Sequence, residues 1–91
     1  MERCLLLYAS LSHVQRVKRR LLEQGIFVDL LRAPQCLASR GCAYALVCPP
    51  STAPQVCDVS RQLSIEIQGA FLESSDGAVP SYAPFPGGAP A

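Results

Sequence analysis

A chain of 91 residues has room for one domain, and its 49% of apolar residues is typical of a packed core rather than a disordered chain. The formal net charge of +1 gives no overall field that would attract nucleic acid or a membrane surface. Arg and Lys interrupt every apolar run before it reaches membrane-spanning length. We therefore expect a small cytoplasmic protein that binds neither nucleic acid nor membrane.

The first quarter of the chain predicts a strand followed by a helix. Residues 4–8 are a continuous apolar run, typical of a strand buried on both faces, and predict a strand over 3–8. Residues 12–24 carry apolar side chains at helical spacing, with Ser12 and Gln15 spaced as a capping box and Gly25 as the stop.

The middle of the chain predicts two further strands around a loop. Alternating side chains over 26–32 indicate a second strand, which ends before Pro34. A loop over 33–41 is rich in small and polar residues, and the apolar run 42–48 then predicts a third strand.

The third quarter predicts a helix over 53–64 and a strand over 66–72. Thr52 is a suitable cap for that helix, and Pro54 is tolerated in its first turn. Gly69 interrupts the last strand as a bulge or turn.

The composition changes at residue 74, where Pro and Gly become frequent. We expect residues 1–73 to form the domain and 74–91 to be a flexible, disordered tail. The order β-α-β-β-α-β predicts an α/β sandwich of the split βαβ or ferredoxin-like type.

The five cysteines favour free thiols over a disulfide framework or a metal site. Their number is odd, they form no CxxC pair, and His13 is the only histidine. We expect no metal, no cofactor and a reducing compartment. Cys4 and Cys48 lie within apolar runs and are expected in the core, while Cys57 adjoins the apolar face of the second helix and is expected to be buried or partly exposed.

Cys42 is the candidate reactive thiol. It follows a loop and opens a strand, Arg40 supplies a nearby cation that would favour the thiolate, and Gly41 allows close approach of a partner. The alternative is that Cys42 is a small buried apolar residue, the usual fate of a free cysteine. Cys36 lies in the same loop and is a candidate partner for a disulfide.

The first predicted helix carries the other candidate residues. His13 is a candidate proton donor or ligand, or an ordinary surface residue. Arg16, Arg19 and Arg20 share one helix face, which either binds an anionic partner or is simply solvated. The chain has no Gly-rich phosphate loop, no Ser/His/Asp set and no obvious pair of carboxylates, so we expect no enzymatic activity.

Three segments carry a family resemblance: residues 10–14 (SLSHV), 21–26 (LLEQGI) and 34–46 (PQCLASRGCAYAL). With them, residues 3–73 resemble the selenium/sulfur carrier protein-like family, small bacterial domains of ferredoxin-like type. Here Ala43 stands where the family usually has glycine, and Val47 stands where a basic residue is frequent.

The resemblance implies that Cys42 carries a sulfur or selenium atom between a donor protein, such as a cysteine desulfurase, and an acceptor protein. Arg16 and Arg19 would then dock the donor. A second hypothesis is a regulatory or adaptor module that binds a partner through its sheet edge and tail, with structural cysteines, and a third is a thiol redox protein using Cys36 and Cys42. The sequence leaves sulfur against selenium and homo-oligomer formation open.

Overall fold

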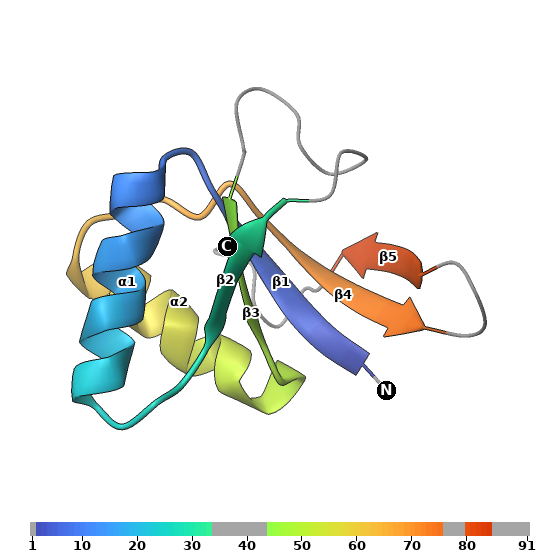
Figure 1. Ribbon diagram of the computed structural model, residues 1–91, viewed down its shortest axis with the longest axis horizontal. Coiled ribbons are helices and arrows are strands. Elements are labelled where there is room, and N and C mark those ends of the chain that lie inside the picture. Colours follow the sequence, from blue (N-terminus) through green and yellow to red (C-terminus); the bar gives the residue numbers. More distant parts are fainter. Residues whose placement is uncertain (1, 34–43, 76–79, 85–91) are drawn as a thin grey trace.

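The computed structural model describes residues 2–33, 44–75 and 80–84. Over these residues the chain is a mixed α/β domain, in which two helices lie on one side of a five-stranded antiparallel sheet (Figure 1). The strand order is β2-β3-β1-β4-β5. The elements in chain order are β1 (Glu2–Tyr8), α1 (Leu11–Glu23), β2 (Asp29–Arg32), β3 (Tyr44–Cys48), the 3-10 turn η1 (Pro50–Thr52), α2 (Ala53–Gln62), β4 (Gly69–Ser75) and β5 (Pro80–Pro84).

Strand β1 is the central strand, and its residues 4–8 are buried on both faces, as the apolar run predicts. Alternate side chains point to opposite faces of a strand, so Leu6 and Tyr8 join the core beneath the helices while Leu5 and Leu7 face away from them. We call the first group the helix-side core; it also takes in Val14, Val17 and Leu21 of α1 and Val56 and Val59 of α2. We call the second group the far-side cluster; its buried members are Leu5, Leu7, Ala33, Ala45 and Val47.

Gly25 stops helix α1 as the sequence predicts, two residues after the last helical residue, Glu23. This glycine has a φ of 79°, a conformation that costs little without a Cβ. Its N–H donates to the Leu22 carbonyl at 3.0 Å, and the Ile26 N–H donates to the Leu21 carbonyl at 2.9 Å. These two bonds define a Schellman motif, which satisfies carbonyl groups at the end of the helix.

Helix α2 ends in the same way without a glycine. Ser64 has a φ of 58° and donates its N–H to the Arg61 carbonyl at 3.0 Å, while the Ile65 N–H donates to the Ser60 carbonyl at 2.8 Å. Ile65 is buried in the helix-side core. The burial of this isoleucine fixes the chain direction after α2 although serine lacks the conformational freedom of glycine.

Two strands begin later than the sequence predicts. Strand β2 begins at Asp29 rather than at residue 26. Strand β4 runs from Gly69 to Ser75 rather than over 66–72. Its pairing with β1 begins at Gly69, and before that residue only the N–H of Gln68 bonds to β1, donating to the Leu7 carbonyl at 2.8 Å. The buried Ile65 and Ile67 give this segment a strand-like pattern before it enters the sheet.

The prediction of a flexible tail from residue 74 is wrong for part of that segment. Ser74 and Ser75 belong to β4, and residues 80–84 form the edge strand β5, which pairs with β4 from Ser75↔Pro80 to Phe71↔Pro84. Proline cannot donate a ladder hydrogen bond, but the ends of an edge strand tolerate it. Residues 76–79 and 85–91 lie outside the described part of the chain.

A charged cluster joins β5 to the sheet on the face opposite the helices. Arg3 forms an ion pair with Glu73, and the Tyr82 hydroxyl donates to the other carboxylate oxygen of Glu73 at 2.8 Å. Glu73 is only 8% exposed. The hydrogen bond from Arg3, helped by that from Tyr82, lowers the pKa of Glu73 and keeps this buried carboxylate ionised.

Candidate functional site

Four of the residues singled out by sequence, Cys36, Arg40, Gly41 and Cys42, lie outside the described residues. Their roles, including a Cys36–Cys42 pair, therefore stay predictions. The structure describes the strands on both sides of this segment, and it describes the other three candidates, His13, Arg16 and Arg19, all of which lie on α1.

Strands β2 and β3, which precede and follow this segment in the chain, pair with each other. Tyr44, the first residue of β3, lies opposite Arg32 of β2 and opposite Tyr8 of β1. The guanidinium carbon of Arg32 lies 6.0 Å from the centre of the Tyr44 ring, a cation–π contact. Arg32 is not among the residues that the sequence singles out. Its contact with Tyr44 depends on the pairing of β2 with β3, which the sequence alone does not reveal.

Tyr8 anchors the same end of the sheet from within the core. Its hydroxyl shares a hydrogen bond of 2.6 Å with the hydroxyl of Ser60 on α2, and both residues are buried. Burial raises the pKa of Tyr8, because the phenolate would lose its solvation. Tyr8 is thus a neutral structural group that ties β1 to α2.

Helix α1 begins one residue before the predicted start, and its N-cap lies two residues before the predicted one. Ser10, not Ser12, is the N-cap, and its hydroxyl oxygen accepts a hydrogen bond from the His13 N–H at 3.2 Å. The Ser12 hydroxyl is instead 3.2 Å from that of Ser10. His13 is therefore the third helical residue, partly exposed in the first turn, where the helix dipole favours a nearby anion.

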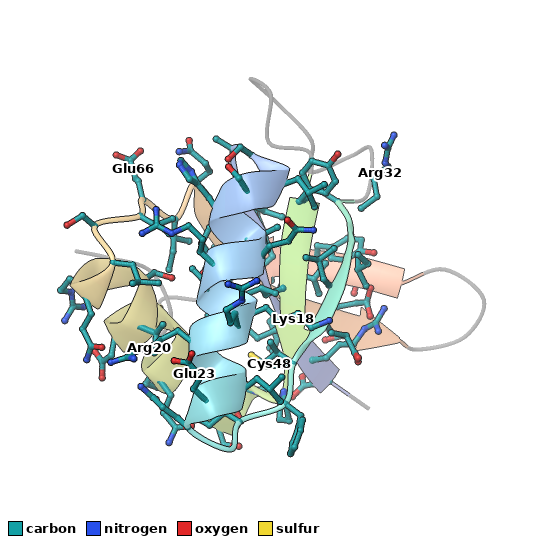
Figure 2. All side chains as sticks on the ribbon, turned by 60° about the vertical axis from the view of Figure 1, so that its left-hand side comes forward. Lys18, Arg20, Glu23, Arg32, Cys48 and Glu66 are labelled. Atoms are coloured by element: carbon teal, nitrogen blue, oxygen red, sulfur yellow. The ribbon has the colours of Figure 1, made fainter. Side chains whose placement is uncertain are left out.

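Arg16, Arg19 and Arg20 lie together, as the helical spacing predicts. With Glu23 and Leu63 they line a shallow pocket of about 190 Å³ where α1 meets the end of α2. Arg20 is engaged by Glu23 at 3.2 Å (Figure 2). No described ion pair engages Arg16 or Arg19, so their charges are available to an anionic partner.

A second, larger pocket of about 400 Å³ lies between α1 and β2. It is lined by Gln15, Lys18, Arg19, Leu22 and Leu30. Figure 2 shows Lys18 on the side of α1 that faces β2. Leu22 is 52% exposed, and Phe27, in the connection between α1 and β2, is 78% exposed. This surface combines positive charge with exposed apolar groups.

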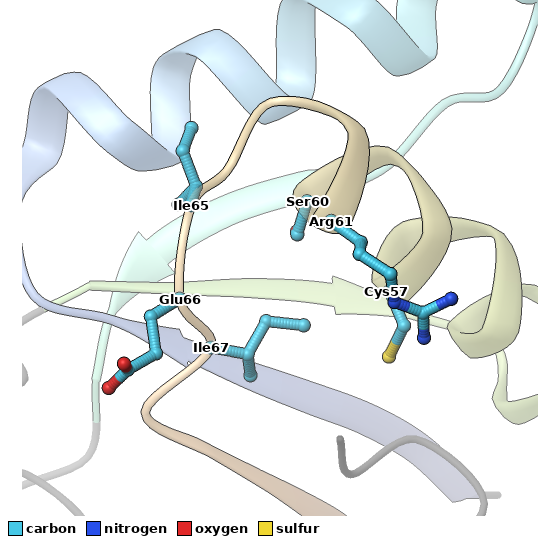
Figure 3. A pocket seen from close by; sticks show the side chains of 6 residues that line it. All are labelled: Cys57, Ser60, Arg61, Ile65, Glu66 and Ile67. Atoms are coloured by element: carbon cyan, nitrogen blue, oxygen red, sulfur yellow. The ribbon is translucent and has the colours of Figure 1, made fainter. Parts of the chain in front are cut away.

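The structure describes three of the five cysteines. Cys4 and Cys48 are 0% and 3% exposed, which confirms their expected place in the core, and Cys57 is half-buried beside that core. Cys57 also lines a pocket of about 120 Å³ beneath the end of α2, with Ser60, Arg61, Ile65, Glu66 and Ile67 (Figure 3). Burial raises the pKa of the Cys57 thiol more than the nearby Arg61 lowers it.

Across residues 2–33, 44–75 and 80–84, no three His, Cys, Asp or Glu side chains are grouped closely enough to hold a metal ion. In the same part of the chain, neither helix combines the length and the apolar character needed to cross a membrane.

Comparison with known proteins identifies the family. The model of the family described as "Putative Se/S carrier protein-like" matches residues 3–72, and the chain belongs to this family. The matched region runs from β1 into β4 and includes all five cysteines. No curated protein and no solved structure matches the chain.

Proposed function

We propose that the protein carries a sulfur or selenium atom on the thiol of Cys42 and transfers it from a donor protein to an acceptor protein. The observation that carries this proposal is the family match over residues 3–72, which includes Cys42. Two described thiols support it by contrast, since Cys4 and Cys48 are closed off in the core and are unsuited to meeting another protein.

Loading would be a simple exchange. The Cys42 thiolate attacks the terminal sulfur of a persulfide on the donor, a new S–S bond forms on Cys42, and the inner sulfur of the donor leaves as a thiolate. The acceptor repeats the attack on the terminal sulfur held by Cys42. Neither step consumes an oxidant, a metal or a cofactor, and the protein acts as a carrier rather than an enzyme.

Cations near the carrier thiol would favour its ionised form. Arg40 is two residues before Cys42 in sequence. Tyr44, two residues after Cys42, begins β3 and lies opposite Arg32, which places this second cation at the same end of the sheet. His13 and the start of α1 add a proton donor and a positive helix end. We assign these groups the role of stabilising the thiolate and the persulfide anion.

Arg16 and Arg19 would dock the donor. Both are exposed, and no described ion pair neutralises them. We propose that they meet an acidic surface on a cysteine desulfurase, and that transfer takes place in the reducing cytoplasm, where a persulfide acceptor thiol stays reduced.

We further assign the domain to the ferredoxin-like, split βαβ type. The order of its first four strands, β2-β3-β1-β4, and its element order β-α-β-β-α-β support this assignment, with β5 as an addition at the edge.

Intact-mass spectrometry after incubation with a cysteine desulfurase and cysteine tests the carrier proposal. Wild-type protein should gain the mass of one sulfur atom and lose it again on treatment with a thiol reductant. Cys42→Ser should gain nothing, while Cys36→Ser should still load. Loading that persists in Cys42→Ser would overturn the proposal.

The docking role has a matched control on the other helix. The pair Arg16→Glu and Arg19→Glu should slow loading about tenfold or more, because opposed charges then face each other at the encounter. Arg61→Glu reverses an exposed charge on α2 and should leave the loading rate nearly unchanged. Equal rates for both variants would remove Arg16 and Arg19 from the donor interface.

A second candidate function is an adaptor that binds a protein partner through the surface between α1 and β2. The exposed Leu22 and Phe27 beside Lys18 favour it, because large exposed apolar side chains are frequent at protein interfaces. If Cys42 fails to load, and Phe27→Ser abolishes the binding of a partner that Cys42→Ser retains, the adaptor function replaces the carrier function.

A further inference from the structure

Two cysteines that are distant in sequence face each other inside the core. Cys4 of β1 and Cys48 of β3 are direct partners in the antiparallel register. Both carry free thiols, and both belong to the helix-side core, so their side chains point to the same face of the sheet. The two thiols thus form a pair that neither cysteine's sequence neighbourhood reveals.

The register places this pair within reach of a disulfide. Directly opposed residues in an antiparallel pair have Cα atoms about 4.5 to 5.5 Å apart. Disulfides join residues whose Cα atoms are about 4.4 to 6.8 Å apart. Formation of a bond between Cys4 and Cys48 therefore requires adjustment of side chains rather than separation of the strands.

The two thiols are also chemically unequal. A side-chain hydrogen bond between them lowers the pKa of Cys48 and raises the pKa of Cys4, to which burial adds. A thiolate attacks faster than a thiol, so this direction favours Cys48 as the member of the pair that reacts first.

The burial of both sulfur atoms limits the size of the reagents that can reach them. Cys48 is 3% exposed, as the last residue of β3, and Cys4 is fully buried. A protein disulfide cannot reach either sulfur while the domain is folded. A hydroperoxide such as hydrogen peroxide is close to water in size, so a small local opening at the end of the strand would admit it.

We propose that Cys4 and Cys48 are a dithiol site that hydroperoxides oxidise to an intramolecular disulfide. In the first step the Cys48 sulfur attacks a peroxide oxygen, the O–O bond breaks, and Cys48 becomes a sulfenic acid as water is released. In the second step Cys4 attacks the oxidised sulfur, an S–S bond forms and a second water leaves. The peroxide takes up the two electrons that the two thiols lose.

The site is separate from the carrier thiol. The oxidation needs neither Cys42 nor a donor protein, so it can be tested in a Cys36→Ser/Cys42→Ser double variant as well as in the wild type. Failure of Cys42 to accept sulfur would leave this inference untouched, and the reverse also holds.

The test is peptide mapping of the folded full-length protein after hydrogen peroxide treatment and alkylation of the remaining thiols. We expect the protein to become two hydrogens lighter and to yield a linked peptide pair containing Cys4 and Cys48, in the wild type and in the double variant. The disulfide should raise Tm by about 5 °C or more, because it constrains the unfolded chain.

Two single variants separate the steps and provide a control. Cys4→Ala, checked for folding by circular dichroism, should leave a sulfenic acid on Cys48 that dimedone traps in larger yield than in the wild type. Cys57→Ala, which alters the neighbouring half-buried cysteine, should leave the linked pair unchanged. Absence of the Cys4–Cys48 link in folded wild-type protein, whether other thiols are oxidised or none is, would overturn the inference.

Discussion

The two faces of the sheet bury their side chains in different chemical settings. The face beneath the helices closes over the helix-side core, where the polar contact between Tyr8 and Ser60 is satisfied internally. The opposite face has the smaller far-side cluster and, beside it, the ionised Glu73 with its partners. Because successive residues of β1 alternate between these faces, neighbours in sequence should respond very differently to substitution.

The largest contrast is expected between two adjacent leucines of β1. Leu6→Ala should lower the free energy of unfolding by about 3 to 4 kcal/mol, since both helices hold the walls of the resulting cavity in place. Leu7→Ala, on the other face, should cost about 2 to 3 kcal/mol, because fewer buried neighbours surround it and they can relax. Urea denaturation measures both, and a larger loss for Leu7→Ala would reverse the proposed ranking of the two faces.

The next effect concerns the polar contact within the helix-side core. Ser60→Ala should cost about 1 to 3 kcal/mol, because it leaves the buried Tyr8 hydroxyl without its 2.6 Å partner. Adding Tyr8→Phe should recover part of the loss, since both polar groups are then gone. The exposed Ser51→Ala is the control. Strict additivity of the two core substitutions would contradict a direct coupling between Tyr8 and Ser60.

The smallest effect belongs to the charged cluster on the opposite face, and it depends on pH. The pKa of Glu73 in the folded protein lies below its ordinary value of 4.5, so its stabilisation is complete above that pH and is lost as pH falls toward the folded value. At neutral pH, Glu73→Gln should cost about 0.5 to 1 kcal/mol, a modest figure because Arg3 is half exposed. Thermal melts from pH 7 to pH 3 should show a smaller acid loss in Glu73→Gln than in the wild type; equal losses would contradict this role.

Much of the fold follows from local sequence pattern. The apolar run of β1, the periodicity of α1 and the glycine at its end each identify an element correctly, because burial and helix termination act over a few residues. Predictions were wrong where distant pairing decides the outcome. Strand β5 contains two prolines and becomes a strand only because β4 offers an edge and Glu73 accepts a hydrogen bond from Tyr82.

The candidate site likewise contains residues that local sequence pattern predicts and residues that depend on distant pairing. Helical spacing brought Arg16 and Arg19 together correctly, because both lie on one helix. The contact of Arg32 with Tyr44 and the pairing of Cys4 with Cys48 depend on strand register, and no local pattern encodes which residues will face each other across two strands. Cys42 became a candidate through its sequence neighbours and the family resemblance.

The central claim is that Cys42 is the thiol that carries the sulfur or selenium atom, and the buried thiols of the helix-side core are the standard against which its reactivity is compared. The most direct measurement is peptide-resolved alkylation by iodoacetamide across a pH series on the folded protein. We predict that Cys42 labels at least about tenfold faster near neutral pH than Cys4 or Cys48, which the core closes off from a reagent of this size, and faster than Cys57, whose pKa is raised. Arg40→Ala should move the labelling of Cys42 to higher pH. Labelling of Cys42 that is no faster than that of Cys4 or Cys48 would contradict the account.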